Sequence, residues 1–358
     1  MRDIGFFSKE RAGELIPGLL VTLGLAVVAY VTWWLLKDTL LKFSALLWAF
    51  IFSIIVSNLL PVLSSEKFHH GIEMSSTRLL RWSIALLGLT FSAAVWANLG
   101  GIGIAAVLIN LVFAFTFGFI FCRYVLKLDG SLTVLLSAGT SICGATAIAA
   151  CGPAIRAKAE EMGLSLAVIT LFGLVAMFGY PLLYYGPLAS WLDNNPLAYG
   201  MWAGMGVHET AQVIVAGSQV EGAAAIAISA KFIRIFMIGP TVLVSLLVFR
   251  QFSSTSGAKQ IKLSIPWFAI VFTIFTLVHL GLDSLSIRYW WSGFNINYLK
   301  PGVTFLLAWS FAAVGLKVKI SAIRSIGLKA FIGGMVVAGV VGGSSLLLVK
   351  YLWMPFSG

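Results

Sequence analysis

The chain has 358 residues, of which 59% are hydrophobic and only 10% are charged, and its mean hydropathy is +0.98. These values exclude an ordinary soluble domain and predict an all-α polytopic membrane protein. The net charge of +11 would suit a nucleic-acid partner in a soluble protein. Here the basic residues lie in short loops between apolar segments, so we expect them to set the topology in the lipid bilayer and expect no nucleic acid as a partner.

A window of about twenty residues predicts about eleven transmembrane helices, which form a single transmembrane domain without a long linker. Loops on the side of the N-terminus carry about twice as many Lys and Arg residues as the opposite loops. This asymmetry predicts a cytoplasmic N-terminus and, for an odd number of spans, an external C-terminus. The expected spans are 16–36, 43–62, 79–96, 100–125, 131–153, 163–185, 197–218, 222–249, 265–282, 302–318 and 326–350.

Small and polar residues interrupt the apolar sequence between Ser137 and Pro153. A freed backbone group at bilayer depth is costly unless protein or water receives it, so we predict a broken helix at a transport site. If the helix restarts near Gly144, its free N–H groups stabilise an anion. The same broken backbone also offers carbonyl oxygens to a sodium ion. The candidate substrate-binding residues of this segment, including three hydroxyl donors, are Thr140, Ser141, Gly144 and Thr146.

A second unusual segment runs from Gly204 to Gly217 and places His208, Glu209 and Gln212 within about one helical turn after a glycine-rich break. Ionisable side chains at membrane depth are expensive, so we interpret these three as a polar cluster on the substrate or proton pathway. The alternative is a buried polar network with a structural role.

The next predicted helix carries Lys231 and Arg234, three residues apart and far from either end of an apolar segment. Two fixed positive charges near the midplane suit an anionic substrate. The alternative is charge pairing with Glu209 or Glu221.

Arg156 follows the first broken segment and lies four residues before Glu160. The spacing favours an ion pair on a solvated helix end. Because the charge rule places this loop on the less basic side, Arg156 could instead line a vestibule that receives anions.

An internal similarity links the two halves of the chain. The segment Trp82–Leu89 is echoed by Trp309–Leu316, and Gly100 is echoed at the same offset by Gly327. The expected number of spans between them is odd, which places the two helices in opposite orientations and predicts an inverted-topology repeat. The alternative is chance similarity between two apolar helices.

At these residues the chain resembles the YeiH family of bacterial inner-membrane proteins, also called the sulfate exporter family. The resemblance rests on the segments Ser137–Ile148, His208–Val213, Lys231–Arg234 and Trp309–Lys317, and it spans nearly the whole chain. The family is grouped with the cation/proton antiporter and anion transporter superfamily. The resemblance therefore implies a bacterial inner-membrane location, inverted repeats with two crossed broken helices, and export of sulfate or sulfite.

One feature of the order of the spans conflicts with that architecture. A linear repeat of five plus five spans puts the second broken helix five spans after the first, yet the segment 204–217 lies two spans after 139–153. Either the second crossing helix is 309–317, or the expected spans between 190 and 250 are wrong.

We therefore expect a secondary-active transporter for a small inorganic or organosulfur oxyanion that works by alternating access. Lys231 and Arg234 would neutralise the substrate, and His208 or Glu209 would couple transport to protons. The alternatives are a cation/proton antiporter, with sodium or another cation exchanging at Glu209, and an anion channel. A homo-oligomer is compatible with the small-residue patterns.

We do not expect an enzyme. The sequence has no His-Glu-x-x-His motif, nucleophile elbow or paired aspartates. Its cysteines are three, an odd number, and lie in apolar segments, which argues against disulfides and a zinc site. We therefore predict no catalytic residues, no metal ion and no other cofactor.

Overall fold

The computed structural model describes residues 9–36, 44–90, 93–252, 267–284, 288–318 and 327–356. Throughout these ranges the regular structure is helical and contains no strand. The chain divides into two compact units, the first formed by Met1–Ser92 and Ile270–Ser321, and the second by Ala93–Ala269 and Ala322–Gly358. The expectation of a single transmembrane domain stays a prediction.

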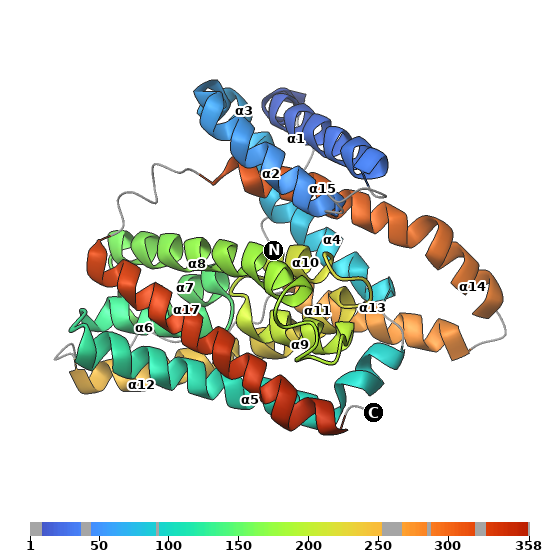
Figure 1. The fold of residues 1–358 in the computed structure, drawn as a ribbon. Helices are drawn as coiled ribbons and strands as arrows, with labels where there is room; N and C mark the ends of the chain where they lie inside the picture. Colours follow the sequence, from blue (N-terminus) through green and yellow to red (C-terminus); the bar gives the residue numbers. More distant parts are fainter. Residues whose placement is uncertain are drawn as a thin grey trace. The chain divides into compact units, whose positions relative to one another are not determined.

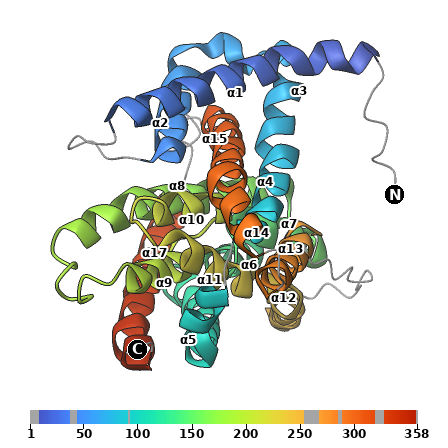
Figure 2. The same ribbon diagram turned by 90° about the vertical axis from the view of Figure 1, so that its right-hand side faces the viewer.

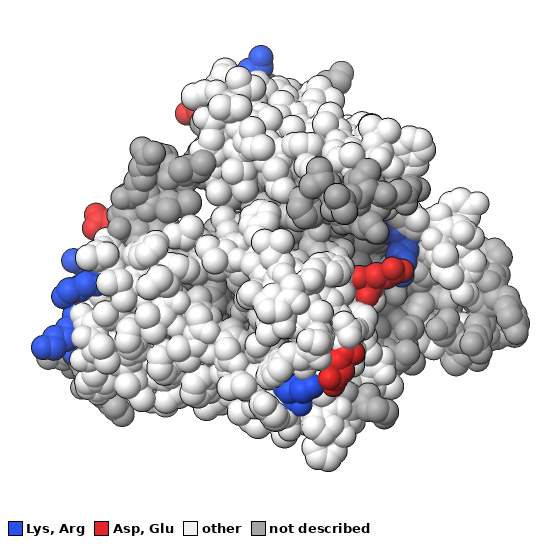
Figure 3. Space-filling model, in the orientation of Figure 1, with Lys and Arg blue, Asp and Glu red and all other residues white. Residues whose placement is uncertain are grey.

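Five segments of the described chain are long and apolar enough to cross a membrane by themselves, and a bent pair of helices brings the number to six. The five are Gly13–Leu36, Ala97–Val125, Glu160–Tyr185, Trp291–Leu316 and Leu328–Phe356. In Figure 3 most of the described surface is uncharged, and the Lys, Arg, Asp and Glu side chains form a few small groups toward its edges and in its lower part. A largely uncharged surface is suited to contact with lipid. These findings confirm an all-α polytopic membrane protein, whereas the expected number of eleven spans is not confirmed.

Three of the expected spans consist of two helices each. Span 131–153 is divided between α6 (Gly130–Ser141) and α7 (Gly144–Ile155), and span 197–218 between α9 (Pro196–Gly206) and α10 (Thr210–Gly217). Span 222–249 comprises α11 (Ala224–Phe236) and α12 (Ile238–Phe252), which are bent by 46° relative to each other.

The expected span 79–96 does not form one helix. The helix α4 (Leu80–Leu87) ends in a short 3-10 turn, η3 (Gly88–Thr90), and α5 (Ala93–Ile120) begins a few residues later. Within α5 the backbone turns at Gly100, whose φ of +59° is favourable only for glycine. Gly100 therefore separates two helical segments that meet at a kink, and the second segment begins just after it, close to the expected start of span 100–125.

Unit 1 begins with α1 (Lys9–Leu36) and α2 (Ala45–Leu59), followed by η1 (Pro61–Ser64) and then by α3 (Glu66–Met74), η2 (Ser75–Leu79) and α4 as one continuous helix. It is completed by α13 (Trp267–Ser284), most of which lies in this unit, and by the continuous run of α14 (Arg288–Phe294), η5 (Asn295–Leu299) and α15 (Lys300–Leu316). The helix α1 packs against α2, α3 and α15, as Figures 1 and 2 show.

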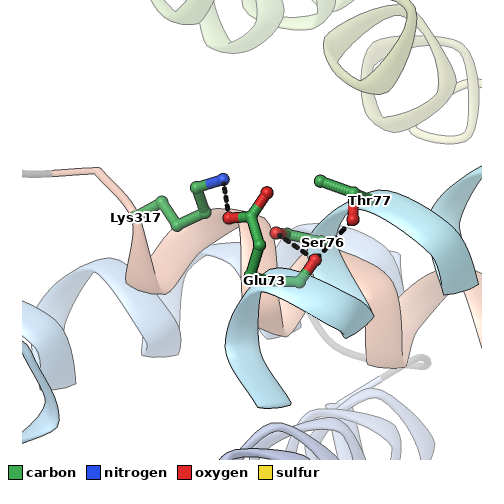
Figure 4. A network of polar contacts seen from close by, with 4 residues as sticks. All are labelled: Glu73, Ser76, Thr77 and Lys317. Carbon is green, nitrogen blue, oxygen red and sulfur yellow. Dashed lines mark hydrogen bonds and ion pairs between the residues drawn. The ribbon is translucent and has the colours of Figure 1, made fainter. Parts of the chain in front are cut away.

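An exposed ion pair joins two helices of unit 1. Lys317, just after α15, donates to the carboxylate of Glu73 in α3 at 2.7 Å. The main-chain carbonyl of Glu73 accepts the hydroxyl groups of Ser76 and Thr77, so this residue is bonded at both ends (Figure 4). Because both charged side chains are about half exposed, the pair adds little stability.

Unit 2 contains α5 with its π-helical end η4 (Phe121–Val125), the broken pairs α6–α7 and α9–α10, and the long helix α8 (Ala159–Tyr185). It also contains α11, α12 and the C-terminal helix α17 (Leu328–Leu348), which continues into η6 (Val349–Trp353) and η7 (Met354–Phe356). The helices α5 and α17 pack against each other and run in opposite directions in Figure 1.

The two similar segments of the sequence have the same succession of elements. The helix α3–η2–α4 is followed by α5–η4, and the helix α14–η5–α15 is followed by α17–η6. In both copies the first helix contains a π-helical turn, η2 or η5, and the second helix ends in one, η4 or η6. A Cβ atom on Gly88 would lie 2.3 Å from the carbonyl oxygen of Phe272 in α13, and one on Gly315 would lie 2.7 Å from that of Phe50 in α2. Both glycines therefore allow a close approach of two helices at the equivalent position.

The broken pairs do not follow a linear order of five plus five elements. The pair α6–α7 comes directly after α5, whereas α9–α10 comes before α13 and the second copy of the repeat. The orientation of the two chain ends stays a prediction.

Candidate functional site

The first break separates α6 from α7 at Ile142 and Cys143. Ile142 has φ −115° and ψ −86°, and Cys143 is extended with φ −156° and ψ 111°. The second helix of the pair begins at Gly144, as the sequence predicts. A Cβ atom at Gly144 would lie 2.6 Å from Cγ2 of Ile169, so only glycine lets α7 start this close to α8.

The second break separates α9 from α10 at Val207, His208 and Glu209. It faces the first break, since Sγ of Cys143 and Oγ1 of Thr210 lie 3.3 Å apart. We refer to the two links, Ile142–Cys143 and Val207–Glu209, as the double break. The second broken helix is therefore the segment around 204–217, whereas 309–316 belongs to the continuous helix α15.

Arg234 joins the ends of the two helices that lead into the double break. Its guanidinium is fully buried, and Nε donates to the carbonyl of Ser141 at 2.7 Å while Nη2 donates to that of Thr140 at 2.6 Å. Nη1 donates to the carbonyls of Gly204, at 3.4 Å, and Met205. The last carbonyls of a helix carry partial negative charge, so one arginine caps α6 and α9 together.

Lys231, one turn earlier on α11, is also fully buried and donates from Nζ to the carbonyls of Val207, at 3.0 Å, and His208. It thereby holds the unwound link of the second break. In the described part of the chain neither Lys231 nor Arg234 forms an ion pair, although Lys231 acts electrostatically on Glu209. Glu221 is exposed. The alternative in which Lys231 and Arg234 pair directly with Glu209 or Glu221 is therefore not seen in the structure.

Glu209 is the N-cap of α10, and its carboxylate accepts from the main chain of Gln212 in a capping box. The main-chain N–H of Glu209 donates to Oε1 of Gln212 at 3.2 Å, and Oγ1 of Thr170 donates to the Glu209 carboxylate at 2.8 Å. A Cβ atom at Gly144 would lie 3.2 Å from the same carboxylate oxygen. A single carboxylate thus lies at the start of both α7 and α10.

His208 differs from its neighbours in having no partner for its ring. The side chain is fully buried, and neither Nδ1 nor Nε2 forms a hydrogen bond. Lys231 and Arg234 act on it electrostatically, so the ring lies near both cations. Nearly all buried polar groups in proteins have a partner, which makes this imidazole a group that a bound ligand would satisfy.

The three hydroxyl groups of the first segment are engaged locally. Thr140 donates to the carbonyl of Leu136 at 2.8 Å, and Ser141 donates to that of Ala138 at 3.1 Å. Thr146 donates to Sγ of Cys143 at 3.7 Å. Thr140 and Ser141 therefore contribute main-chain carbonyls to Arg234, a role that the sequence interpretation did not include.

Arg156 is exposed and lies at the C-cap of α7, with a φ of +54°. The helix α8 starts only at Ala159, so Arg156 and Glu160 do not share a helix. The ion pair favoured by their spacing is absent from the described residues, and a role of Arg156 in a vestibule stays a prediction.

Sequence reasoning missed two residues of α8 that hold the second broken pair. Thr170 donates its hydroxyl to Glu209 and accepts, through its carbonyl, from Nε2 of Gln212 at 3.1 Å. A Cβ atom on Gly173 would lie 2.0 Å from Oε1 of Gln212, so the absence of a side chain at Gly173 leaves the space that the Gln212 amide group occupies. The available signal was a threonine three residues before a glycine in an apolar helix, a pattern of small and polar residues that is common where membrane helices pack closely.

The helical fold and the buried charges at paired helix breaks define a polytopic membrane protein with a specialised polar centre. Comparison with known proteins places it more narrowly: the chain belongs to the UPF0324 membrane protein family, the family of YeiH. A family described as "Conserved hypothetical protein 698" matches residues 17–334.

Three relatives illustrate the similarity. A UPF0324 membrane protein of Yersinia pestis is 33% identical over 96% of this chain and 91% of its own length. One of Pseudomonas aeruginosa is 35% identical over 88% of both chains, and the inner membrane protein YeiH of Escherichia coli is 32% identical over 85% of both. No solved structure matches the chain. The names of these relatives assign them to a membrane and to no substrate.

Proposed function

We propose that this protein is a secondary-active transporter that moves a small oxyanion by alternating access, with the double break as its substrate site. The observation that carries the proposal is the distribution of charge around the two breaks. Fully buried Arg234 caps the C-terminal ends of α6 and α9, and Lys231 holds the link that follows α9. The carboxylate of Glu209 lies at the N-terminal ends of α7 and α10.

The double break has an excess of positive charge. With Lys231 and Arg234 protonated and Glu209 ionised, two cations oppose one carboxylate among the described residues, and the excess is one positive charge. An uncompensated charge at membrane depth is costly unless a counter-ion or water stabilises it. A bound anion supplies that counter-ion, which favours an anionic substrate.

The hydrogen-bond donors at the double break also suit an oxyanion. Four N–H groups of Arg234 and two of Lys231 are engaged, which leaves one donor on each side chain. The buried ring of His208 adds a third donor. Sulfate and sulfite carry several acceptor oxygens around one centre, and the resemblance to the sulfate exporter family favours them among oxyanions.

A sodium site at the same breaks is less favoured. A sodium ion at a broken helix requires free carbonyl oxygens, but six carbonyls at these breaks already accept from Arg234 or Lys231. We therefore do not propose a cation/proton antiporter centred on Glu209, and the experiment below would detect one.

The location and orientation form part of the proposal. We place the protein in the bacterial inner membrane with a cytoplasmic N-terminus and an external C-terminus, on the basis of the names of its relatives and the loop charges.

The test is counterflow in proteoliposomes that contain the purified full chain. Vesicles preloaded with unlabelled sulfate or sulfite should accumulate labelled sulfate faster than empty vesicles, and a channel would show no such acceleration by the trans anion. Lys231→Met should abolish the flux, whereas Lys329→Met, at an exposed position of α17, should not. Flux that follows a sodium gradient without any dependence on anions would overturn the proposal.

A further inference from the structure

The carboxylate of Glu209 already occupies the place where an anion would bind most favourably. It accepts from the main chain at the start of α10 and from the Thr170 hydroxyl at 2.8 Å, and it abuts Gly144 at the start of α7. The N-terminal ends of both helices carry partial positive charge and free N–H groups. The protein thus holds its own anion at both helix starts.

Glu209 also differs in exposure from the other charged groups of the double break. Lys231, Arg234 and His208 are each 0% exposed, whereas Glu209 is partly exposed. Among the charged groups of the double break, the carboxylate of Glu209 is thus the one that a proton can reach from outside the protein.

His208 gives an independent indication of a ligand. Its side chain is fully buried, and neither ring nitrogen has a hydrogen-bond partner within the described residues. The Glu209 carboxylate does not satisfy it. A hydrogen-bond partner is therefore missing on the link of the second break, at the residue that precedes Glu209 in the chain.

We propose that Glu209 is a tethered competitor of the transported anion. In its ionised form the carboxylate occupies the anion site at the starts of α7 and α10, and protonation releases that site to the substrate oxyanion. The proton comes from water, binds a carboxylate oxygen, and returns to water when the carboxylate displaces the anion again. This inference rests on the proposed function and specifies how that site is regulated.

The charges balance for a dianion. When Glu209 is ionised the double break has one positive charge in excess, and when Glu209 is protonated it has two, from Lys231 and Arg234. A sulfate dianion neutralises those two charges. Each sulfate that binds is therefore accompanied by one proton.

Few other titratable groups surround Glu209. On α11 these are Lys231 and Arg234, and on the links of the double break they are His208 and the thiol of Cys143. On α8, Tyr180 acts electrostatically on Arg234. Within the described residues this group contains no second carboxylate. A pH dependence that disappears with the carboxyl group is thus attributable to Glu209.

The experiment measures sulfate binding to the detergent-purified full chain as a function of pH. Sulfate and thiosulfate stay doubly charged between about pH 5.5 and pH 8, so a change in affinity originates in the protein. For the wild type we expect the affinity for sulfate to fall as pH rises, because binding takes up one proton. At pH values above the pKa of the Glu209 carboxyl group, the affinity should fall by up to about tenfold per pH unit. Glu209→Gln should bind with high affinity throughout, with a change of less than about twofold.

Two further variants complete the design. Glu221→Gln removes an exposed carboxylate of the same unit and should keep the pH dependence of the wild type. Thr170→Val preserves Glu209 but removes its hydroxyl donor, so it should bind sulfate more tightly than the wild type near pH 8 even if Glu209→Gln does not fold.

The outcomes separate the two proposals. If no oxyanion binds to any variant at any pH, the proposed function fails and this inference fails with it. If sulfate binds to the wild type without pH dependence, or if the dependence persists in Glu209→Gln, the proposed function stands and the tethered competitor is overturned.

Discussion

The guanidinium of Arg234 donates from Nε to the main-chain carbonyl of Ser141 at 2.7 Å, across a separation of 93 residues in the sequence. Ser141 is the last residue of α6, and its carbonyl has no partner of its own within that helix. The same guanidinium reaches the end of α9. One side chain therefore connects the ends of α6 and α9, the first halves of the two broken helices.

Arg234→Lys tests this bridge. A lysine keeps the positive charge but lacks the planar fork, so it can satisfy only part of the four carbonyls that Arg234 contacts. We expect destabilisation of about 2 to 5 kcal/mol and loss of transport, because buried acceptors lose charged partners. Thermal unfolding in detergent measures it, with Arg250→Lys at an exposed position of α12 as the control. An unchanged melting temperature would mean that the bridge is not structural.

His208→Leu separates stability from binding. The imidazole has two buried nitrogens without partners, so an apolar side chain of similar size removes an unsatisfied group. We expect an unchanged or higher melting temperature together with at least about tenfold weaker binding of sulfate, the equivalent of a lost hydrogen bond to a charged ligand. A clear loss of stability with normal sulfate affinity would assign His208 to the protein core instead.

Gly144→Ala tests the contact at the start of α7. The added Cβ would lie 2.6 Å from the side chain of Ile169 and 3.2 Å from the Glu209 carboxylate, so the helix start and the carboxylate must separate. We expect a cost of about 1 to 3 kcal/mol and altered anion affinity. Gly163→Ala, with open space around the new Cβ on α8, is the matched control and should be neutral or stabilising by up to about 1 kcal/mol. Equal effects of the two substitutions would contradict the geometry.

Gly88→Ala and Gly315→Ala test the repeated helix contact of unit 1. In both cases the new Cβ would approach a main-chain carbonyl, at 2.3 Å and 2.7 Å respectively, and the backbone cannot move aside as a side chain can. We expect each variant to lose about 1 to 3 kcal/mol, whereas Gly24→Ala, in open space on α1, should be tolerated. A tolerated substitution at only one of the two positions would show that the repeats no longer share this packing.

The break before Gly144 was predicted from the sequence, because small and polar residues at the depth of the bilayer are not expected in a helix that only anchors the protein in the membrane. It also identified the buried pair Lys231 and Arg234, whose apolar surroundings made them conspicuous. It did not predict what these cations contact, since main-chain carbonyls leave no signature in the side-chain sequence. The partners expected from the sequence were an anionic substrate or the carboxylates of Glu209 and Glu221.

The order of the broken helices along the chain was also not predicted correctly from the sequence. Hydropathy windows of about twenty residues merge two half-helices into one span, as they did for 131–153 and 197–218. The repeated motifs around Trp82 and Trp309 lie in helices with the same succession of elements, while the inverted repeat itself stays a prediction. The motifs did not indicate the position of the second break, which precedes the second copy. Contacts between distant segments, such as that of Cys143 with Thr210, were needed to place it.

The central claim is that the double break binds an oxyanion, and a thermal-shift panel on the detergent-purified protein tests it most directly. The panel compares sulfate, sulfite, thiosulfate, small carboxylates and sodium at matched ionic strength. Any ligand of the folded state raises the melting temperature according to its concentration relative to its dissociation constant. We predict saturable stabilisation by a sulfur oxyanion that is lost in Lys231→Met. Stabilisation by sodium alone, with no effect of any oxyanion, would contradict the account.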